Sequence, residues 1–255
     1  MPSAVLTLLL AFILQAGGAK SLQPSAAQII GKVDTGKLKG EPTQLAWSPD
    51  GSQFFLQTSE RDNQAMVKNP RYFLLNGTDA KATSASAMPD WAQEYWSWKS
   101  AQSPAGSKAM TIEIKRTERV GTATSAPMGG SLARGGASGD PNTGTTVEDV
   151  ATRALQTQRD QVITLTLKSE VVGEFVNTQF LPGYSFGWAP QGSQLIAYRN
   201  QNGRLAIMDE RGEKQELQDT KDVLLPAWSG DGSKIAFLQR TGKNKYDLVV
   251  VSVKQ

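Results

Sequence analysis

Three features of this sequence predict an all-β fold, a propeller of about four blades. A short motif, in which a Trp is followed by a tight turn and an apolar strand, recurs along the chain. The regular copies are spaced as one four-stranded blade requires, and polar turn sequences separate the strands that follow each copy. One short helix and one Gly-rich loop are expected as insertions in this β framework.

The motif is clearest in "AWSPDGSQFFLQT", which begins at Ala46. It returns as "GWAPQGSQLIAYR" around Trp188 and as "AWSGDGSKIAFLQR" around Trp228, and these two Trp residues lie 40 residues apart. A fourth, degraded copy begins at "WSWKSAQSPAGSKAMTIEIKR", where Trp98 takes the position of the Trp that closes a buried strand. A period near 40 residues is typical of one propeller blade.

Each copy has a mechanical interpretation. We expect Trp47, Trp188 and Trp228 to pack between neighbouring blades, and the Gly of each turn to adopt the positive φ that precedes the next strand. Asp50 and Asp231 occupy equivalent turn positions. We expect them to cap the turn through Asx hydrogen bonds, and calcium binding is the alternative.

These repeats resemble the PD40 repeats, which are WD40-like, of the TolB family of β-propellers. The resemblance covers residues 43–255, but the chain has no room for a separate N-terminal domain and has four motifs where the family propeller has six. It implies a TolB-like propeller that belongs to the bacterial cell envelope and binds another protein.

The second blade is expected to carry an insertion, because Trp98 and Trp188 lie 90 residues apart. The Gly-, Ser- and Ala-rich residues 121–144 cannot bury a core and predict a disordered loop, within a flexible insertion at 121–146. Residues 145–160 have apolar side chains at helical spacing and a capping box at Thr145 and Glu148. We expect this helix to pack on the propeller rim, with docking of a partner as the alternative.

The N-terminal region predicts export. Residues 4–14, "AVLTLLLAFIL", form an apolar run too short to span a bilayer and are followed by small residues, as in a signal peptide at 1–19. A buried N-terminal strand or helix is the alternative. After cleavage we expect a periplasmic or secreted protein with no stable membrane insertion.

Residues 20–42 form an N-terminal segment that contains a candidate closing strand, "AQIIGKVD", at 27–34. The last repeat ends after its third strand, so this segment can supply the missing outer strand and close a four-bladed ring. The alternative is an incomplete array that a second copy of the chain completes, which would make a homodimer.

Composition excludes several chemistries. The chain of 255 residues has no Cys and no His, which removes thiol nucleophiles, thiolate or imidazole metal ligands and every Ser-His-Asp mechanism. The formal charge is +3, from 27 basic and 24 acidic residues that are scattered, which argues against nucleic acid as a partner. No nucleophile elbow, phosphate loop, carboxylate pair or calcium loop occurs in usable form, so we predict no catalytic, cofactor-binding or metal-binding residues.

One aromatic cluster, "DWAQEYWSW", contains Trp91, Tyr95, Trp96 and Trp98. Core packing is the first interpretation, and an exposed aromatic surface for a peptide or glycan is the second. The sequence predicts an exported, non-enzymatic propeller that mediates protein–protein interaction in the bacterial envelope, with its three turns gathered on one face. The alternative is a peptidase-associated or carbohydrate-active propeller enzyme, or a glycan-binding module.

Overall fold

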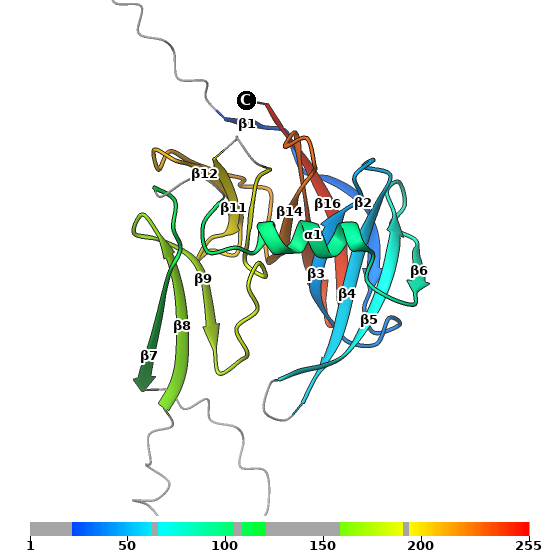
Figure 1. The fold of residues 1–255 in the computed structure, drawn as a ribbon, viewed down its shortest axis with the longest axis horizontal. Coiled ribbons are helices and arrows are strands. Elements are labelled where there is room, and N and C mark those ends of the chain that lie inside the picture. The colour runs from blue at the N-terminus through cyan, green and yellow to red at the C-terminus, as the bar shows by residue number, and fades with distance from the viewer. Residues whose placement is uncertain (1–21, 63–65, 105–108, 121–158, 191–193, 255) are drawn as a thin grey trace, which may run out of the picture.

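Four antiparallel sheets make up the protein, arranged in a ring as the blades of a four-bladed β-propeller (Figure 1). The computed structural model describes residues 22–62, 66–104, 109–120, 159–190 and 194–254. The predicted all-β propeller is therefore confirmed. The predicted signal peptide, the Gly-rich loop and nearly all of the predicted helix at 145–160 lie outside the described residues; Arg159 and Asp160, its last two residues, belong to a strand.

Blade 1 follows the first copy of the motif. Its strands pair in sequence order, and both faces of the second strand are buried, since Phe54, Phe55 and Leu56 are each about 1% exposed or less. A strand covered on both faces is a continuous apolar run, which explains why the motif is followed by "FFL" without alternation. The strands are β3 (Glu41–Trp47), β4 (Gln53–Arg61), β5 (Val67–Asn76) and β6 (Ala82–Ala85).

Blade 3 has the same order and shorter strands. Its middle strands are again buried on both faces, with Ile196, Ala197 and Tyr198 at 0% exposure. The strands are β10 (Phe186–Trp188), β11 (Leu195–Arg199), β12 (Leu205–Asp209) and β13 (Lys214–Glu216).

Blade 4 contains both ends of the described chain. Strands β14 (Val223–Trp228), β15 (Lys234–Gly242) and β16 (Lys245–Lys254) pair in order, and β2 (Gln28–Asp34) pairs antiparallel with β16 as the outer strand. The short β1 (Gln23–Pro24) pairs with the far end of β16. The N-terminal strand thus closes the ring within one chain, as predicted, and the open-array alternative is not the observed fold.

Blade 2 is irregular. Its sheet has three strands among the described residues, β7 (Glu113–Val120), β8 (Arg159–Leu167) and β9 (Glu170–Val176), and the helix α1 (Asp90–Lys99) precedes them. The helix contacts β3 of blade 1 and β10 of blade 3, so it bridges the inner strands on either side of blade 2. Figure 1 shows α1 crossing beside β3.

The prediction that Trp98 ends an inner strand is wrong, because Trp98 lies in α1. The physical reason is local. Residues 90–99 contain no β-branched side chain, Pro89 stops the preceding extended segment, and Asp90 and Lys99 place their charges to suit the helix dipole. The Trp-rich spacing resembles the blade motif, but the residues between the rings favour a helix.

Indole hydrogen bonds connect successive inner segments. The Nε1 of Trp47 donates to Ala227 O at 2.9 Å, and the Nε1 of Trp228 donates to Gly187 O at 3.0 Å. The Nε1 of Trp188 donates to Ala101 O, just after α1, at 2.7 Å. Each regular Trp therefore seals its blade onto a neighbour, which confirms the predicted inter-blade role, and the same bond reaches blade 2 through the end of the helix.

Candidate functional site

The propeller has two unlike faces. The inner strands β3, β10 and β14 each end in the motif Trp and lead into its turn, so the turns gather at one end of the ring. We call this end the turn face; Pro49, Pro190 and Gly230 line one pocket there, which confirms that the turns of the three copies meet. The opposite end, where Glu41, Arg61 and Arg240 lie, we call the polar face.

Each Asp-containing turn of the turn face is locked by the same hydrogen bonds. In blade 1, the Ser48 hydroxyl donates to Asp50 Oδ1 at 2.6 Å, and Ser52 donates its N–H to Oδ1 at 3.1 Å and its hydroxyl to Oδ2 at 2.7 Å. Gly51 between them has φ of 71°.

In blade 4, Ser229 and Ser233 donate to Asp231 in the same pattern, at 2.5, 3.0 and 2.7 Å, and Gly232 also has φ of 71°. The two carboxylates therefore cap turns, as expected. Within the described residues no group of three or more acidic side chains could hold a metal ion.

Hydrogen bonding sets the protonation of these two carboxylates. The Ser48 and Ser52 side chains, followed by the Ser52 N–H, lower the pKa of Asp50 to about 2. For Asp231 the Ser229 hydroxyl, and then the N–H and hydroxyl of Ser233, also lower the pKa to about 2. Both side chains are exposed and negatively charged at neutral pH, so the turn face carries fixed negative charge.

Helix α1 lies against the turn face and is fastened there by Tyr95. The buried Tyr95 hydroxyl donates to Trp228 O, at the end of β14, at 2.8 Å. Ala92, Tyr95 and Lys99 form the buried face of the helix, at the spacing i, i+3 and i+7. The helix is therefore packed as an integral element of the propeller fold.

The side of α1 that is not buried borders a pocket of about 500 Å³. Trp91 and Trp98 are half-buried in its wall and Glu94 is exposed at its edge. The rings are held in place by other rings: Trp98 meets Tyr95 edge-on with centroids 4.8 Å apart, and Trp91 meets Phe55 edge-on at 6.4 Å. The pocket, which we call the aromatic pocket, is lined by Trp47, Ser48, Pro49, Trp91, Glu94, Tyr95, Trp98, Pro190 and Gly230.

The two interpretations of the aromatic cluster therefore apply to different residues. Tyr95 is a core residue, with 6% of its surface exposed, whereas Trp91 and Trp98 are partly open to the pocket. Glu94 is the charged residue among the lining side chains. Aromatic ring faces together with a carboxylate suit an apolar or cationic side chain of a ligand.

Lys99 is a buried cation inside the ring. Its side chain has 0% exposure; the ammonium donates to Gly183 O at 3.1 Å and lies 4.2 Å from the centre of the Trp96 ring. Burial lowers the pKa of Lys99 well below its ordinary value, since removal from water penalises the charged form. No sequence signal distinguished this lysine from an ordinary helix C-terminal cation.

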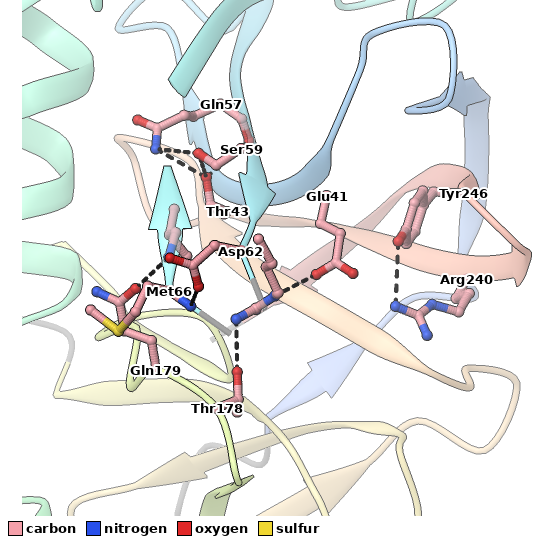
Figure 2. A network of polar contacts seen from close by, with 12 residues as sticks. Glu41, Thr43, Gln57, Ser59, Asp62, Met66, Thr178, Gln179, Arg240 and Tyr246 are labelled. Carbon is pink, nitrogen blue, oxygen red and sulfur yellow. Dashed lines mark hydrogen bonds and ion pairs between the residues drawn. The ribbon is translucent and has the colours of Figure 1, made fainter. Parts of the chain in front are cut away.

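The polar face holds the network drawn in Figure 2. The Arg61 Nε pairs with Glu41 Oε2 at 2.7 Å, and its Nη1 donates to the Thr178 hydroxyl at 2.7 Å. The Gln179 side-chain oxygen accepts the Val67 N–H at 2.7 Å. These bonds join blade 1 to the segment after β9, so blades 1 and 2 are linked by polar contacts on this face.

Arg240, on β15, lies beside the network. Its guanidinium donates to the Tyr246 hydroxyl at 3.4 Å and lies over the Tyr246 ring at 5.7 Å from the centroid (Figure 2). Sequence reasoning missed this network, because its residues come from three blades and share no motif.

Comparison with known proteins adds little to this geometry. No family model matches the chain, and no curated protein matches it. A solved structure of a protein provisionally described as TolB, from Agrobacterium tumefaciens, aligns with 89% of this chain at 15% identity and a TM-score of 0.23. The chain spans 65% of the length of that structure. The assignment of the fold therefore rests on the four sheets and their ring closure.

No helix among the described residues is long and apolar enough to cross a membrane.

Proposed function

We propose that this protein is a non-enzymatic propeller of the bacterial envelope, periplasmic or secreted, that binds a protein partner through its turn face. The supporting observation is the aromatic pocket, where two partly open Trp rings and a carboxylate lie above turns that are locked by hydrogen bonds. Rigid aromatic side chains in a preformed hollow are the usual anchors of protein interfaces.

The chemistry of the pocket indicates what the partner presents. Trp91 and Trp98 offer aromatic surface, Glu94 supplies negative charge, and the adjoining turns carry the ionised Asp50 and Asp231. An apolar segment that carries an Arg or Lys matches all three features, because a cation over an aromatic face gains from the ring quadrupole and from the nearby carboxylates.

The test compares how much partner the immobilised chain and its charge-reversal variants capture from bacterial envelope extract. Glu94→Lys places a cation at the pocket edge without disturbing a buried contact, and we expect it to reduce capture at least about tenfold. Glu210→Lys is the matched control, since Glu210 is equally exposed in the turn between β12 and β13 and does not line the pocket. Equal capture by both variants would contradict the proposal.

A glycan-binding module is the second candidate, because partly open Trp rings also suit the apolar faces of sugars. Titration of the chain with soluble cell-wall glycan fragments separates the two. Saturable binding of glycan that Trp91→Ala abolishes, together with loss of protein capture, would replace the protein partner by a carbohydrate. Hydrolase activity that copurifies with the chain and disappears on replacement of one carboxylate would replace binding by catalysis.

A further inference from the structure

A second pocket opens on the polar face between blades 2 and 3. It has a volume of about 520 Å³, within the range of small-ligand sites. One wall is apolar and is formed by Val171, Phe175, Val176 and Tyr184; the other is polar and includes Ser185, Arg199 and Asn200. This pocket is separate from the aromatic pocket of the turn face, with which it shares no residue.

Ser185 brings an unused donor into this pocket. The residue is 6% exposed, and its hydroxyl finds no hydrogen-bond partner within the described part of the chain. A buried hydroxyl without a partner destabilises the fold unless something else accepts its proton. A ligand that reaches this hydroxyl, whose oxygen is itself buried in the pocket wall, can do so.

Gly173 packs directly against this hydroxyl. A Cβ at position 173 would lie 2.2 Å from Ser185 Oγ, so any larger residue at this position would collide with the hydroxyl. The place of the Ser185 hydroxyl in the pocket wall thus depends on the absence of a side chain at position 173.

Arg199 lies next to Ser185, on the neighbouring strand. Phe186 pairs with Tyr198 across β10 and β11, and the next residues outward, Ser185 and Arg199, are joined by a 2.7 Å backbone hydrogen bond from Arg199 N to Ser185 O. Residues directly opposite in an antiparallel pair project their side chains from the same face. The hydroxyl and the guanidinium therefore border the same space, as their shared place in the pocket lining also shows.

The charges of the lining favour a monoanion. Arg61 and Arg199 line the pocket with one carboxylate, Glu174, which pairs with Arg119 at 3.5 Å. Arg61 is held by Glu41 and Thr178, whereas Arg199 has a long ion pair of 3.9 Å with the exposed Asp222. One loosely engaged guanidinium and one hydroxyl match a carboxylate, which carries a single charge and accepts several hydrogen bonds.

We propose that this pocket binds a carboxylate that carries an apolar group. The carboxylate lies between Ser185 and Arg199, and the apolar group packs against Phe175 and Val176. Two sources share this chemistry: the C-terminal residue of a peptide, and a small aliphatic acid. The site is independent of the partner proposed for the turn face.

Isothermal titration of the full chain with three probes tests the assignment. N-acetyl-leucine represents a peptide C-terminus, 4-methylpentanoate represents an aliphatic acid, and N-acetyl-leucinamide has the same shape without the charge. We expect N-acetyl-leucine, alone or together with 4-methylpentanoate, to bind with a Kd below about 10 mM. N-acetyl-leucinamide should bind at least about tenfold more weakly. Binding of both acids indicates the aliphatic source, and binding of N-acetyl-leucine alone indicates a peptide.

Variants give the decisive comparison. Arg199→Gln is expected to weaken binding of the acid about tenfold or more, and Ser185→Ala about threefold to tenfold while the fold is kept. Arg204→Gln is the control, since Arg204 pairs with Glu216 outside the pocket. Equal binding of acid and amide, no binding of either acid at about 10 mM, or unchanged affinity in Arg199→Gln would overturn the proposal.

Discussion

Two sides of this ring are closed by different means. Between blades 3, 4 and 1 the inner strands contact one another directly, and Trp47 and Trp228 donate buried indole hydrogen bonds to the backbone of the neighbouring blade. On the blade 2 side, α1 replaces the inner strand and Arg61 makes a polar link on the opposite face. The first arrangement follows the repeat, and the second departs from it.

The difference indicates how stability and recognition are divided. The regular junctions are buried and apolar, so they stabilise the ring and expose little side-chain surface. The irregular side supplies the helix that borders the aromatic pocket, and β9 of blade 2 forms a wall of the second pocket. In this propeller both candidate binding sites lie where the repeat is broken, as sites often do when a rigid frame positions variable elements.

The largest expected effect is at a regular junction. Trp228→Ala should lower the free energy of unfolding by roughly 3 to 5 kcal/mol, because loss of the 0% exposed ring leaves a cavity and removes the indole hydrogen bond to Gly187 O. Trp91→Ala, on the irregular side, removes a partly open ring and should lower it by about 1 to 2 kcal/mol. Urea denaturation measures both, and a loss under about 1 kcal/mol for Trp228→Ala would place that ring outside the structural core.

The next largest effect is an increase in the free energy of unfolding. Lys99→Met should raise the free energy of unfolding at neutral pH by about 1 to 3 kcal/mol, because it removes a buried amine whose charged form is penalised by burial and has no carboxylate partner among the described residues. Burial of Lys99 also predicts that the stability of the fold depends on pH. Burial depresses the pKa of Lys99 in the fold, so the unfolded chain binds more protons between that lowered pKa and the ordinary value near 10.5.

Stability of the natural chain should therefore rise with pH through that window, and Lys99→Met should remove this rise. Thermal unfolding between pH 7 and pH 10 tests it. Destabilisation of Lys99→Met by more than about 1 kcal/mol at neutral pH would mean that the bond to Gly183 O outweighs the penalty of burying the ammonium.

The polar link between blades 1 and 2 should matter less. The side chains of Arg61 and Glu41 are 22% and 45% exposed, so water screens their attraction. We expect Arg61→Met to lower the free energy of unfolding by about 1 kcal/mol or less, and the difference to shrink when salt is raised to about 1 M. If Arg61→Met lowered the free energy of unfolding as much as Trp228→Ala, the two sides of the ring would not differ in stability as we expect.

The smallest effect is expected at the locked turns. Hydrogen bonds lower the pKa of Asp50 and Asp231 to about 2 in the fold, from an ordinary value of 3.8. Their contribution is therefore present above about pH 4 and is lost as pH falls toward 2. The double variant with Asp50→Asn and Asp231→Asn should lose less Tm than the natural chain between pH 4 and pH 2, and differ from it by about 3 °C or less at pH 7. Equal acid sensitivity of the two proteins would assign the loss to other groups.

The sequence predicted the regular side of the ring well. Trp47, Trp188 and Trp228 recur with the same turn chemistry, and turn chemistry is local, so the blade boundaries could be found without tertiary information. The closing strand β2 was predicted from the unpaired edge that the last repeat would otherwise leave.

The irregular side was predicted less well, for physical reasons. Trp98 fits the motif by residue type, and the absence of β-branched residues from 90 to 99 was the signal for a helix that the motif search did not weigh. Neither the hydrogen bond from Arg61 to Thr178 nor the close packing of Gly173 against Ser185 has a sequence signature. Both depend on how two blades meet in space.

Hydrogen–deuterium exchange of the chain, with and without its captured partner, tests most directly the claim that the partner is recognised at the turn face, beside α1. The account predicts that the partner slows exchange in α1 and in the turns at 48–52 and 229–233, which border the aromatic pocket, and leaves the polar-face segments 172–179 and 199–203 unchanged. Slower exchange confined to those polar-face segments, with α1 unaffected, would contradict it.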